Sequence, residues 1–195
     1  MELKNGIATF YAASRQDWRN WLEKNAENEI SVWLIIHKKA SPHPSIYYPE
    51  AVDEALCFGW IDSKANTRDE FTYYQFFSKR KPKSNWSKVN KIKVAQLIEL
   101  GLMRPLGLKM IEHAKSIGTW DALNEVEEIR VPDEMQKLFD QQPIAFQHWN
   151  LFSRSVKRGI LEWILNAKRP ETRTKRIVET VSLAAENKKA NQYRP

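Results

Sequence analysis

Cysteine is scarce in this sequence, whose 195 residues contain only Cys57. A single cysteine excludes a disulfide within the chain and a zinc site made of several thiolates, and it fits a reducing compartment. Because Cys57 ends an apolar segment, we expect a buried, unreactive thiol rather than a nucleophile activated by His37 or His43.

Long apolar runs are also missing. The longest, Val32–Ile36, is far shorter than the roughly 20 residues that cross a bilayer as a helix. Residues 1–6 contain no apolar segment followed by small residues of the kind that marks a secretory signal. We therefore expect no membrane insertion and a cytoplasmic location.

The sequence lacks the short motifs of common metal, cofactor and catalytic sites. Its four histidines, at positions 37, 43, 113 and 148, do not have the spacing of metal ligands. Neither a glycine-rich phosphate loop nor a G-x-S-x-G motif is present. The sequence therefore predicts no metal site and no cofactor.

Positive charge and large aromatic side chains, by contrast, are plentiful. The formal net charge is +7, and there are eight tryptophans and eight phenylalanines. A chain of this length with 42% hydrophobic residues can bury a sizeable core in one or two domains. The excess of positive charge permits anionic partners without requiring them.

The first part of the chain alternates between helix and strand patterns. The expected elements are a helix at 15–25, a strand at 30–37, a helix from Pro49 that ends at Gly59, and strands at 60–63 and 70–77. The last two strands are expected to pair as an antiparallel hairpin with its turn at 65–69. The predicted fold class is α+β, with a small antiparallel sheet and flanking helices.

Helical periodicity takes over after the second of these strands. Ser84 or Asn85 is expected to cap a helix that runs to Leu100, and Pro105 to open another that ends at Ile117. Residues 120–130 are expected to form an acidic connection.

An all-helical C-terminal unit is expected to follow this connection, because helix-starting prolines and one capping serine recur there. These residues are Pro132, Pro143, Ser153 and Pro170. The sequence thus predicts an α+β domain at 1–125, a helical tail domain at 131–188 and a frayed tail at 189–195.

Two aromatic stretches, 55–63 and 76–87, point to a binding site in the α+β domain. Brought together by folding, they would form a tryptophan-lined pocket with positive walls. The residues expected to bind a ligand there are Trp60, Asp62, Ser63, Lys79, Arg80, Lys81, Lys83, Ser84, Asn85 and Trp86.

The positive charge of this site comes from a run between Lys79 and Lys93, which has seven lysines and arginines and no acidic residue. The run enters a predicted helix start, where free N–H groups and the helix dipole favour anions, and Trp86 is expected in the first turn. One interpretation is a site for phosphate, carboxylate or the nucleic-acid backbone. The other is a solvated basic face with Trp86 in the core.

Asp62 is the one weak candidate for a catalytic residue. It follows a predicted strand and can pair with Arg80 or Lys79, orient a ligand, or act as an acid or base. A structural salt bridge is the commoner outcome for such an aspartate, and no nucleophile and base are paired by their spacing.

A second group of basic residues lies in the C-terminal helices, where a nucleic-acid surface is one interpretation and a solvated outer face is the other. Its members are Arg154, Lys157, Arg158, Lys168, Arg169, Arg173, Lys175 and Arg176. No recognised nucleic-acid motif accompanies them.

Over most of its length the chain resembles the bacterial YdeI/OmpD-associated family, also called bacteriocin-protection proteins. The most specific segments are 54–63 and 81–90, and 131–132 and 163–173 fit as well. Where relatives tend to have Phe-Thr-Pro-Arg-Arg, residues 77–80 read Phe-Ser-Lys-Arg, which keeps the charge and loses a proline. The resemblance implies a small α+β domain, a helical domain, no particular catalytic residues, and a role in resistance to antimicrobial peptides or stress.

Three hypotheses about function follow. The first is a cytoplasmic, non-catalytic protein that binds a small anionic or phosphorylated ligand, with an indirect role in resistance because a basic protein repels cationic peptides. The second is a nucleic-acid-binding protein that uses both basic groups. The third is an enzyme that acts on an anionic substrate with Asp62 as acid or base. The sequence defines no oligomeric state.

Overall fold

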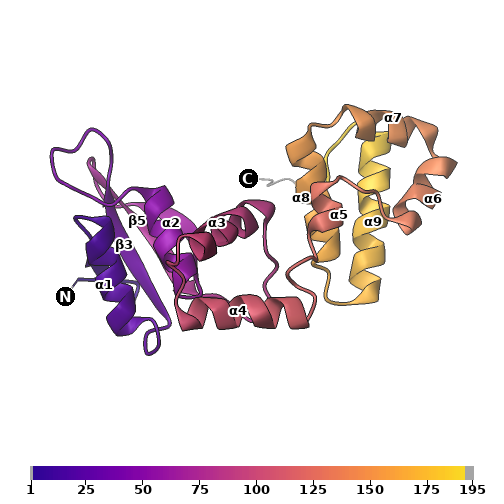
Figure 1. Cartoon of the computed structure of the whole chain (residues 1–195). Helices are drawn as coiled ribbons and strands as arrows, with labels where there is room; N and C mark the ends of the chain where they lie inside the picture. Colours follow the sequence, from indigo (N-terminus) through magenta and orange to yellow (C-terminus); the bar gives the residue numbers. More distant parts are fainter. Residues whose placement is uncertain (1, 192–195) are drawn as a thin grey trace. The chain divides into compact units, whose positions relative to one another are not determined.

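The structure, a computed structural model, describes residues 2–191 of the chain, which divides into two compact units, Met1–Ala122 and Leu123–Pro195 (Figure 1). Each unit has its own cluster of buried apolar side chains. Of the tail expected to fray, 192–195 lie outside the described residues. Within the described range, no helix is long and apolar enough to cross a membrane.

The first unit is built on a five-stranded sheet. Its strands are β1 (Leu3–Lys4), β2 (Ile7–Tyr11), β3 (Ser31–His37), β4 (Trp60–Thr67) and β5 (Thr72–Lys79). Their order across the sheet is β1-β2-β3-β5-β4, and every neighbouring pair is antiparallel except β2 and β3. The α+β fold class is therefore confirmed.

The pattern of the sequence did not predict the two N-terminal strands. Strand β1 has two residues and β2 has five, which is too short for period-2 alternation to be recognised. Parallel pairing of β2 with β3 needs a crossover connection, and helix α1 (Arg15–Asn25) provides it. The pairing is therefore a property of the folded unit rather than of the local sequence.

The hairpin of β4 and β5 is confirmed, but its turn lies later than expected. Strand β4 continues through Thr67, so the expected turn residues 65–67 belong to the strand. The real turn is held by the Asp69 carboxylate, which accepts hydrogen bonds from the N–H groups of Phe71 (2.9 Å) and Thr72 (2.7 Å). An irregular register between Asp62 and Ala65 interrupts the alternation of inward and outward side chains along β4. The second half of the strand therefore lacks the sequence pattern by which strands are predicted.

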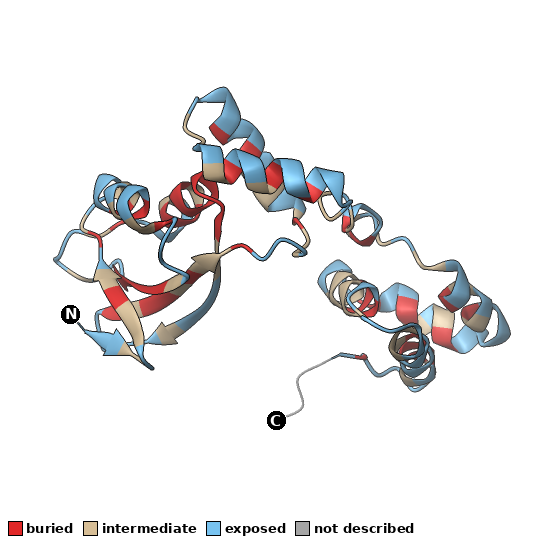
Figure 2. Cartoon of the chain, turned by 90° about the horizontal axis from the view of Figure 1, so that it is seen from below, coloured by how far each residue is buried: buried red, intermediate tan, exposed pale blue. Residues whose placement is uncertain are grey.

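Helices α1 and α2 (Tyr48–Cys57) pack against the sheet and against each other, and their bounds agree with the prediction. Ser14 caps α1 by accepting a hydrogen bond from the Asp17 N–H (3.1 Å), and Gly59 ends α2 with a φ of +72°. The Trp18 Nε1–H donates to the Ala51 carbonyl (3.0 Å) and joins the two helices. Figure 2 shows buried segments where these helices meet the sheet.

Tryptophan side chains fill much of the core beneath these helices. Trp18, Trp60 and Trp86 are almost fully buried, and the Trp60 Nε1–H donates to the Ala26 carbonyl (3.2 Å). Burial of the large apolar ring stabilises the unit, and the hydrogen bond of the indole N–H avoids the cost of burying an unpaired polar atom.

Two further helices, α3 (Lys88–Glu99) and α4 (Pro105–Ser116), complete the first unit. The prediction for α4 is confirmed, but the expected cap of α3 at Ser84 or Asn85 is wrong. The cap is Ser87, whose Oγ accepts a hydrogen bond from the Asn90 N–H (3.3 Å). Trp86 must enter the core before the chain can turn into the helix, so it precedes α3 instead of occupying its first turn.

The second unit is helical throughout, as expected. Its helices are α5 (Asn124–Glu127), α6 (Asp133–Gln141), α7 (Pro143–Leu151), α8 (Arg154–Leu165) and α9 (Pro170–Ala185). The predicted helix starts for the last four are confirmed. The segment 120–130, expected to be a connection only, contains α5 and buries Leu123 and Val126 in the core of this unit.

Candidate anion-binding pocket

A pocket of about 560 Å³ opens beside Gly59 in the first unit, and we call it the Gly59 pocket. Part of its wall is apolar and is formed by Ala26, Phe58, Pro82, Leu106 and Met110. The remaining wall is polar and mainly basic, and is formed by Glu27, Lys79, Arg80, Lys109 and His113. Pockets of this size bind small organic molecules in many proteins.

Arg80 is the most unusual group of the pocket because its cation is buried without a carboxylate. Only 6% of the residue is exposed, and no ion pair with an acidic side chain forms among residues 2–191. The guanidinium carbon lies 3.7 Å from the Trp86 ring centroid, and Nη2 donates to the Asn85 carbonyl. The Nε–H is buried and has no hydrogen-bond partner among the described residues.

The electrostatic state of Arg80 follows from this environment. Burial lowers the pKa of Arg80 to about 10, and the more distant charge of Asp62 opposes the shift only in part. The guanidinium therefore still carries its charge at neutral pH, in surroundings that destabilise that charge. A bound anion would relieve this penalty and satisfy unused N–H groups at the same time.

Gly59 shapes the floor of the pocket. A Cβ atom at this position would lie 2.9 Å from the Met110 Cγ and 3.3 Å from the Leu106 carbonyl oxygen, and its backbone has a φ of +72°. Only glycine combines this conformation with such close contact to α4. The residue thus lets α4 lie near the junction of α2 and β4 and form the opposite wall.

The structure brings two of the predicted ligand-binding residues, Lys79 and Arg80, into the pocket. Trp86 lies against Arg80 as a stacking partner, and Asn85 accepts a hydrogen bond from it through its carbonyl group. Trp60 belongs to the buried core and does not line this pocket. Instead of two tryptophans, the pocket has one aromatic side chain, Phe58, together with the aliphatic side chains of Leu106 and Met110 on α4.

The remaining predicted residues lie outside the Gly59 pocket. Asp62 accepts a hydrogen bond from the Tyr48 hydroxyl (2.6 Å) rather than pairing with Arg80, and burial together with this bond raises the pKa of Tyr48. Ser63 is exposed on the edge strand β4. Asp62 is thus engaged in a local contact between α2 and β4.

The loop between β5 and α3 holds the other three. Lys81 and Lys83 are exposed and do not line the pocket, and the Ser84 hydroxyl donates to the Lys81 carbonyl (2.7 Å). This hydrogen bond stabilises the loop, so the Ser84 hydroxyl has a structural role there. The two lysines lie close in sequence to the pocket and provide matched controls for those inside it.

Sequence reasoning missed the contribution of α4. Leu106 and Met110 are four residues apart, as are Lys109 and His113, so the helix presents an apolar row beside a basic row to the pocket. The spacing is visible in the sequence, but it does not reveal which neighbour the rows face. Only the packing of α4 against Gly59 shows that they belong to one site.

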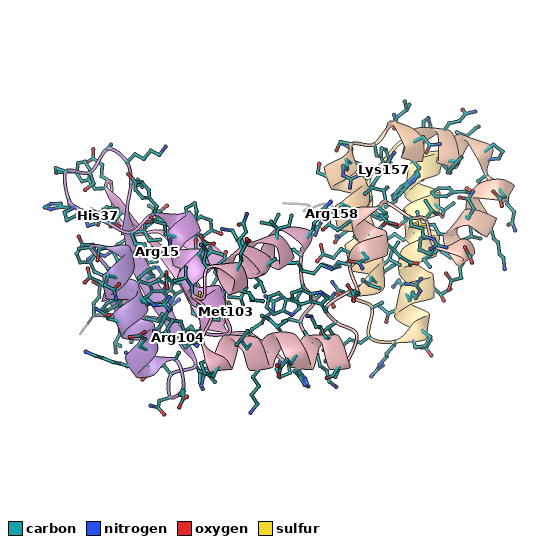
Figure 3. All side chains as sticks on the ribbon, viewed as in Figure 1. Arg15, His37, Met103, Arg104, Lys157 and Arg158 are labelled. Atoms are coloured by element: carbon teal, nitrogen blue, oxygen red, sulfur yellow. The ribbon has the colours of Figure 1, made fainter. Side chains whose placement is uncertain are left out.

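The basic group of the second unit is largely engaged in contacts within that unit. Arg158 forms ion pairs with Glu127 and Glu162 (2.8 Å each), and Arg173 forms one with Glu134 (3.4 Å). Arg176 donates to the Trp163 carbonyl. Figure 3 labels Arg158 and its neighbour Lys157 on α8. These contacts favour a structural role over a continuous nucleic-acid surface.

A second pocket, of about 480 Å³, surrounds His37 and the loop that precedes α2. The His37 Nδ1 lies 2.7 Å from the Ser41 hydroxyl, and the rings of His37 and His43 are 5.3 Å apart. Figure 3 places His37 well apart from Arg104 at the start of α4. No group of three potential metal ligands gathers here or elsewhere in the part of the chain that the structure describes.

The reactivity of the Cys57 thiol reports whether the core next to the Gly59 pocket is closed to solvent and reagents. Cys57 is fully buried, and burial and the nearby Glu54 charge raise the pKa of its thiol to about 11. We expect Ellman's reagent to leave the native protein unmodified at pH 8 and to react with one thiol per chain after unfolding. Rapid modification of the native protein would contradict the packing.

The raised thiol pKa also has a consequence for stability. Between pH 9 and pH 11 the folded state retains a proton that the unfolded state has lost, so this contribution to the free energy of unfolding decreases as the pH rises. Replacing Cys57 by alanine should reduce this part of the pH dependence in chemical denaturation experiments.

The fold and the pocket together define a class of protein: an α+β unit with a buried cation in an amphipathic pocket, joined to a helical unit. Comparison with protein-family models agrees with this division. Residues 10–110, just over half of the chain, match a domain of unknown function, DUF8412, and the chain belongs to that family. Residues 128–187 match the family described as Bacteriocin-protection, YdeI or OmpD-Associated.

The resemblance to the YdeI/OmpD-associated family is therefore confirmed, and it applies to the helical unit. The match does not extend over most of the chain as expected: segments 54–63 and 81–90 fall within the DUF8412 match instead. No curated protein and no solved structure matches the chain. The pocket therefore has to be interpreted from its own chemistry.

Proposed function

We propose that this protein is a binding protein whose first unit holds a small anionic ligand in the Gly59 pocket. The observation that carries the proposal is Arg80, a cation that is 6% exposed, has no acidic partner among the described residues, and lines a pocket. A buried, unpaired charge is costly, whereas the same charge paired with a ligand contributes to binding.

The other charges of the pocket support an anion. Lys79 and Lys109 lie on different elements, β5 and α4, and both line the pocket with Arg80. Cations that converge on a concave surface raise the local concentration of anions and increase the association rate. Their convergence in a space of about 560 Å³ favours a compact ligand over the backbone of a nucleic acid.

Removal of the pocket lysines is the direct test. We expect Lys79→Ala and Lys109→Ala each to weaken binding of inorganic phosphate or acetate about three- to tenfold in isothermal titration calorimetry, since each removes a charged contact. Arg80→Gln should reduce binding most. Lys81→Ala and Lys83→Ala, which remove equal charges outside the pocket, should leave affinity within twofold at 150 mM salt.

Two results would contradict this function. One is that the unmodified protein binds none of phosphate, acetate and a longer carboxylate such as octanoate at millimolar concentrations. The other is equal loss of affinity in the pocket and control variants, because this would show a diffuse effect of net charge rather than a site. Thermal unfolding monitored by circular dichroism will verify that each variant is folded.

We further infer a cytoplasmic location and an indirect role in protection against bacteriocins or stress. The single, buried Cys57 fits a reducing compartment, and the description of the family matched by the helical unit suggests protection. A net charge of +7 disfavours direct capture of cationic peptides. Binding of an anionic metabolite accounts for an indirect effect without such contact.

A further inference from the structure

We propose that the ligand of the Gly59 pocket is an amphipathic organic acid, with one carboxylate head and an extended apolar body. The inference rests on the anion-binding function proposed above and specifies the class of ligand. It follows from the way that apolar and basic side chains are distributed in the pocket.

Apolar side chains from two elements line the pocket. Phe58 comes from the C-terminal end of α2, and Leu106 and Met110 lie one turn apart on α4. A site for inorganic phosphate or another fully hydrated anion would gain nothing from such walls. A hydrocarbon body, by contrast, gains free energy from each methylene group that it buries there.

The basic part of the pocket lies along one side of this apolar surface. Lys109 and His113 form the row next to Leu106 and Met110 on α4, while Arg80 and Lys79 approach from the end of β5. An elongated ligand that lies along α4 therefore meets hydrocarbon on one side and a cationic group at its head. The buried Arg80 provides planar N–H donors that match a carboxylate.

The number of charges limits the ligand to a low negative charge. Three permanent cations line the pocket, and Glu27 adds a carboxylate at its edge. Lys79 is already committed in part, since its Nζ donates to the Glu27 carbonyl (2.6 Å). A polyphosphate would exceed the positive charge that remains and would place hydrated oxygens on the apolar wall, so the balance favours a monoanion.

The test is a chain-length series in isothermal titration calorimetry on the full chain, using acetate, butanoate, hexanoate and octanoate as probes. Affinity should rise with length, by up to about fourfold for each buried methylene group. Octylamine, which has the same body and the opposite charge, should not compete with octanoate. Adenosine triphosphate should bind less tightly than octanoate.

A variant of the apolar wall separates the body from the head. Met110→Gln should flatten the dependence on chain length while acetate binding stays within about threefold. Leu108→Gln is the matched control, because Leu108 is partly exposed on the same helix and does not line the pocket. Lys109→Ala should have the opposite effect, with weaker binding at every length and an unchanged dependence on length.

The outcomes distinguish this inference from the function on which it rests. If acetate and phosphate bind but affinity does not increase with chain length, the anion site stands and the amphipathic ligand is wrong. If adenosine triphosphate binds more tightly than octanoate, the inferred class is likewise wrong. If none of the anions binds, both proposals fail.

Discussion

Replacing Glu54 by alanine will lower the free energy of unfolding of the first unit by about 3–5 kcal/mol, the cost of removing one partner from a buried ion pair. Glu54 is 2% exposed on α2, and its two carboxylate oxygens accept hydrogen bonds from Arg15 Nε and Arg19 Nη1 on α1 (2.5 Å each). Figure 3 labels Arg15 on α1. Loss of the carboxylate removes the ion pair of Arg15 and leaves Arg19 with only its longer ion pair to Glu23 (3.7 Å) among the described residues.

The arginines show why the effect should be large. Burial is the strongest single influence on Arg19 and lowers its pKa, but the hydrogen bond to Glu54, the charge of Glu54 and the contact with Cys57 together raise the pKa above its usual value. The side chain of Arg19 is 12% exposed and also donates to the Leu102 carbonyl (2.9 Å), so it cannot swing into water without breaking that bond. Removal of Glu54 therefore loosens the contact of α1 with α2 and with the segment before α4.

Urea denaturation monitored by tryptophan fluorescence will measure this loss. Glu112→Ala provides the control, because Glu112 is an exposed glutamate on α4 of the same unit and should change stability by less than about 0.5 kcal/mol. A change below 1 kcal/mol for Glu54→Ala would show that Arg15 and Arg19 find water or other partners without cost.

The second large effect is expected at Gly107, where alanine should destabilise the first unit by about 3 kcal/mol through overpacking. A Cβ atom there would lie 2.3 Å from the carbonyl oxygen of Cys57 and 2.8 Å from both its carbonyl carbon and the Met103 Cε. The carbonyl group cannot rotate away, because it accepts a hydrogen bond from the Arg104 N–H (3.0 Å). Helix α4 would have to separate from the end of α2.

This substitution should also weaken ligand binding, because α4 forms one wall of the Gly59 pocket. We expect the affinity for octanoate to fall about tenfold as Leu106 and Met110 move away from Phe58. Gly159→Ala is the matched control: Gly159 lies within a helix, and an added Cβ would meet no atom within 4 Å. Its stability should stay unchanged or rise by up to about 1 kcal/mol. Equal behaviour of the two variants would contradict the close packing at Gly107.

The helices of this protein are largely predictable from its sequence, because their signals are local. Ser14 before α1, Gly59 after α2 and Pro105 at the start of α4 each act within a few residues, and the observed helices begin and end there. The cap of α3 is the instructive exception. Ser84 and Ser87 are equivalent as local signals, and the burial of Trp86 between them decides in favour of Ser87.

The sheet was predicted less completely, since its pairing depends on distant segments. Strand β2 has a weak local pattern and is stabilised by pairing with β3, whose residues lie more than 20 positions away. The polar second half of β4 is likewise a strand because β5 pairs with it. Short, polar or irregular strands owe their structure to their neighbours, and a sequence window does not contain those neighbours.

The sequence by itself determined most of the helical boundaries, the α+β class, the helical C-terminal unit and the dense positive charge around Lys79 and Arg80, because each depends on local periodicity, capping residues or composition. Only the tertiary structure decided which of these charges share a pocket. Tertiary packing buried Trp60 and Trp86 in the core and left Lys81 and Lys83 exposed to solvent. It also brought residues of α4 and Arg80 into the same pocket. The physical reason is that close packing against Gly59 and Gly107, rather than proximity in the sequence, brings these walls together.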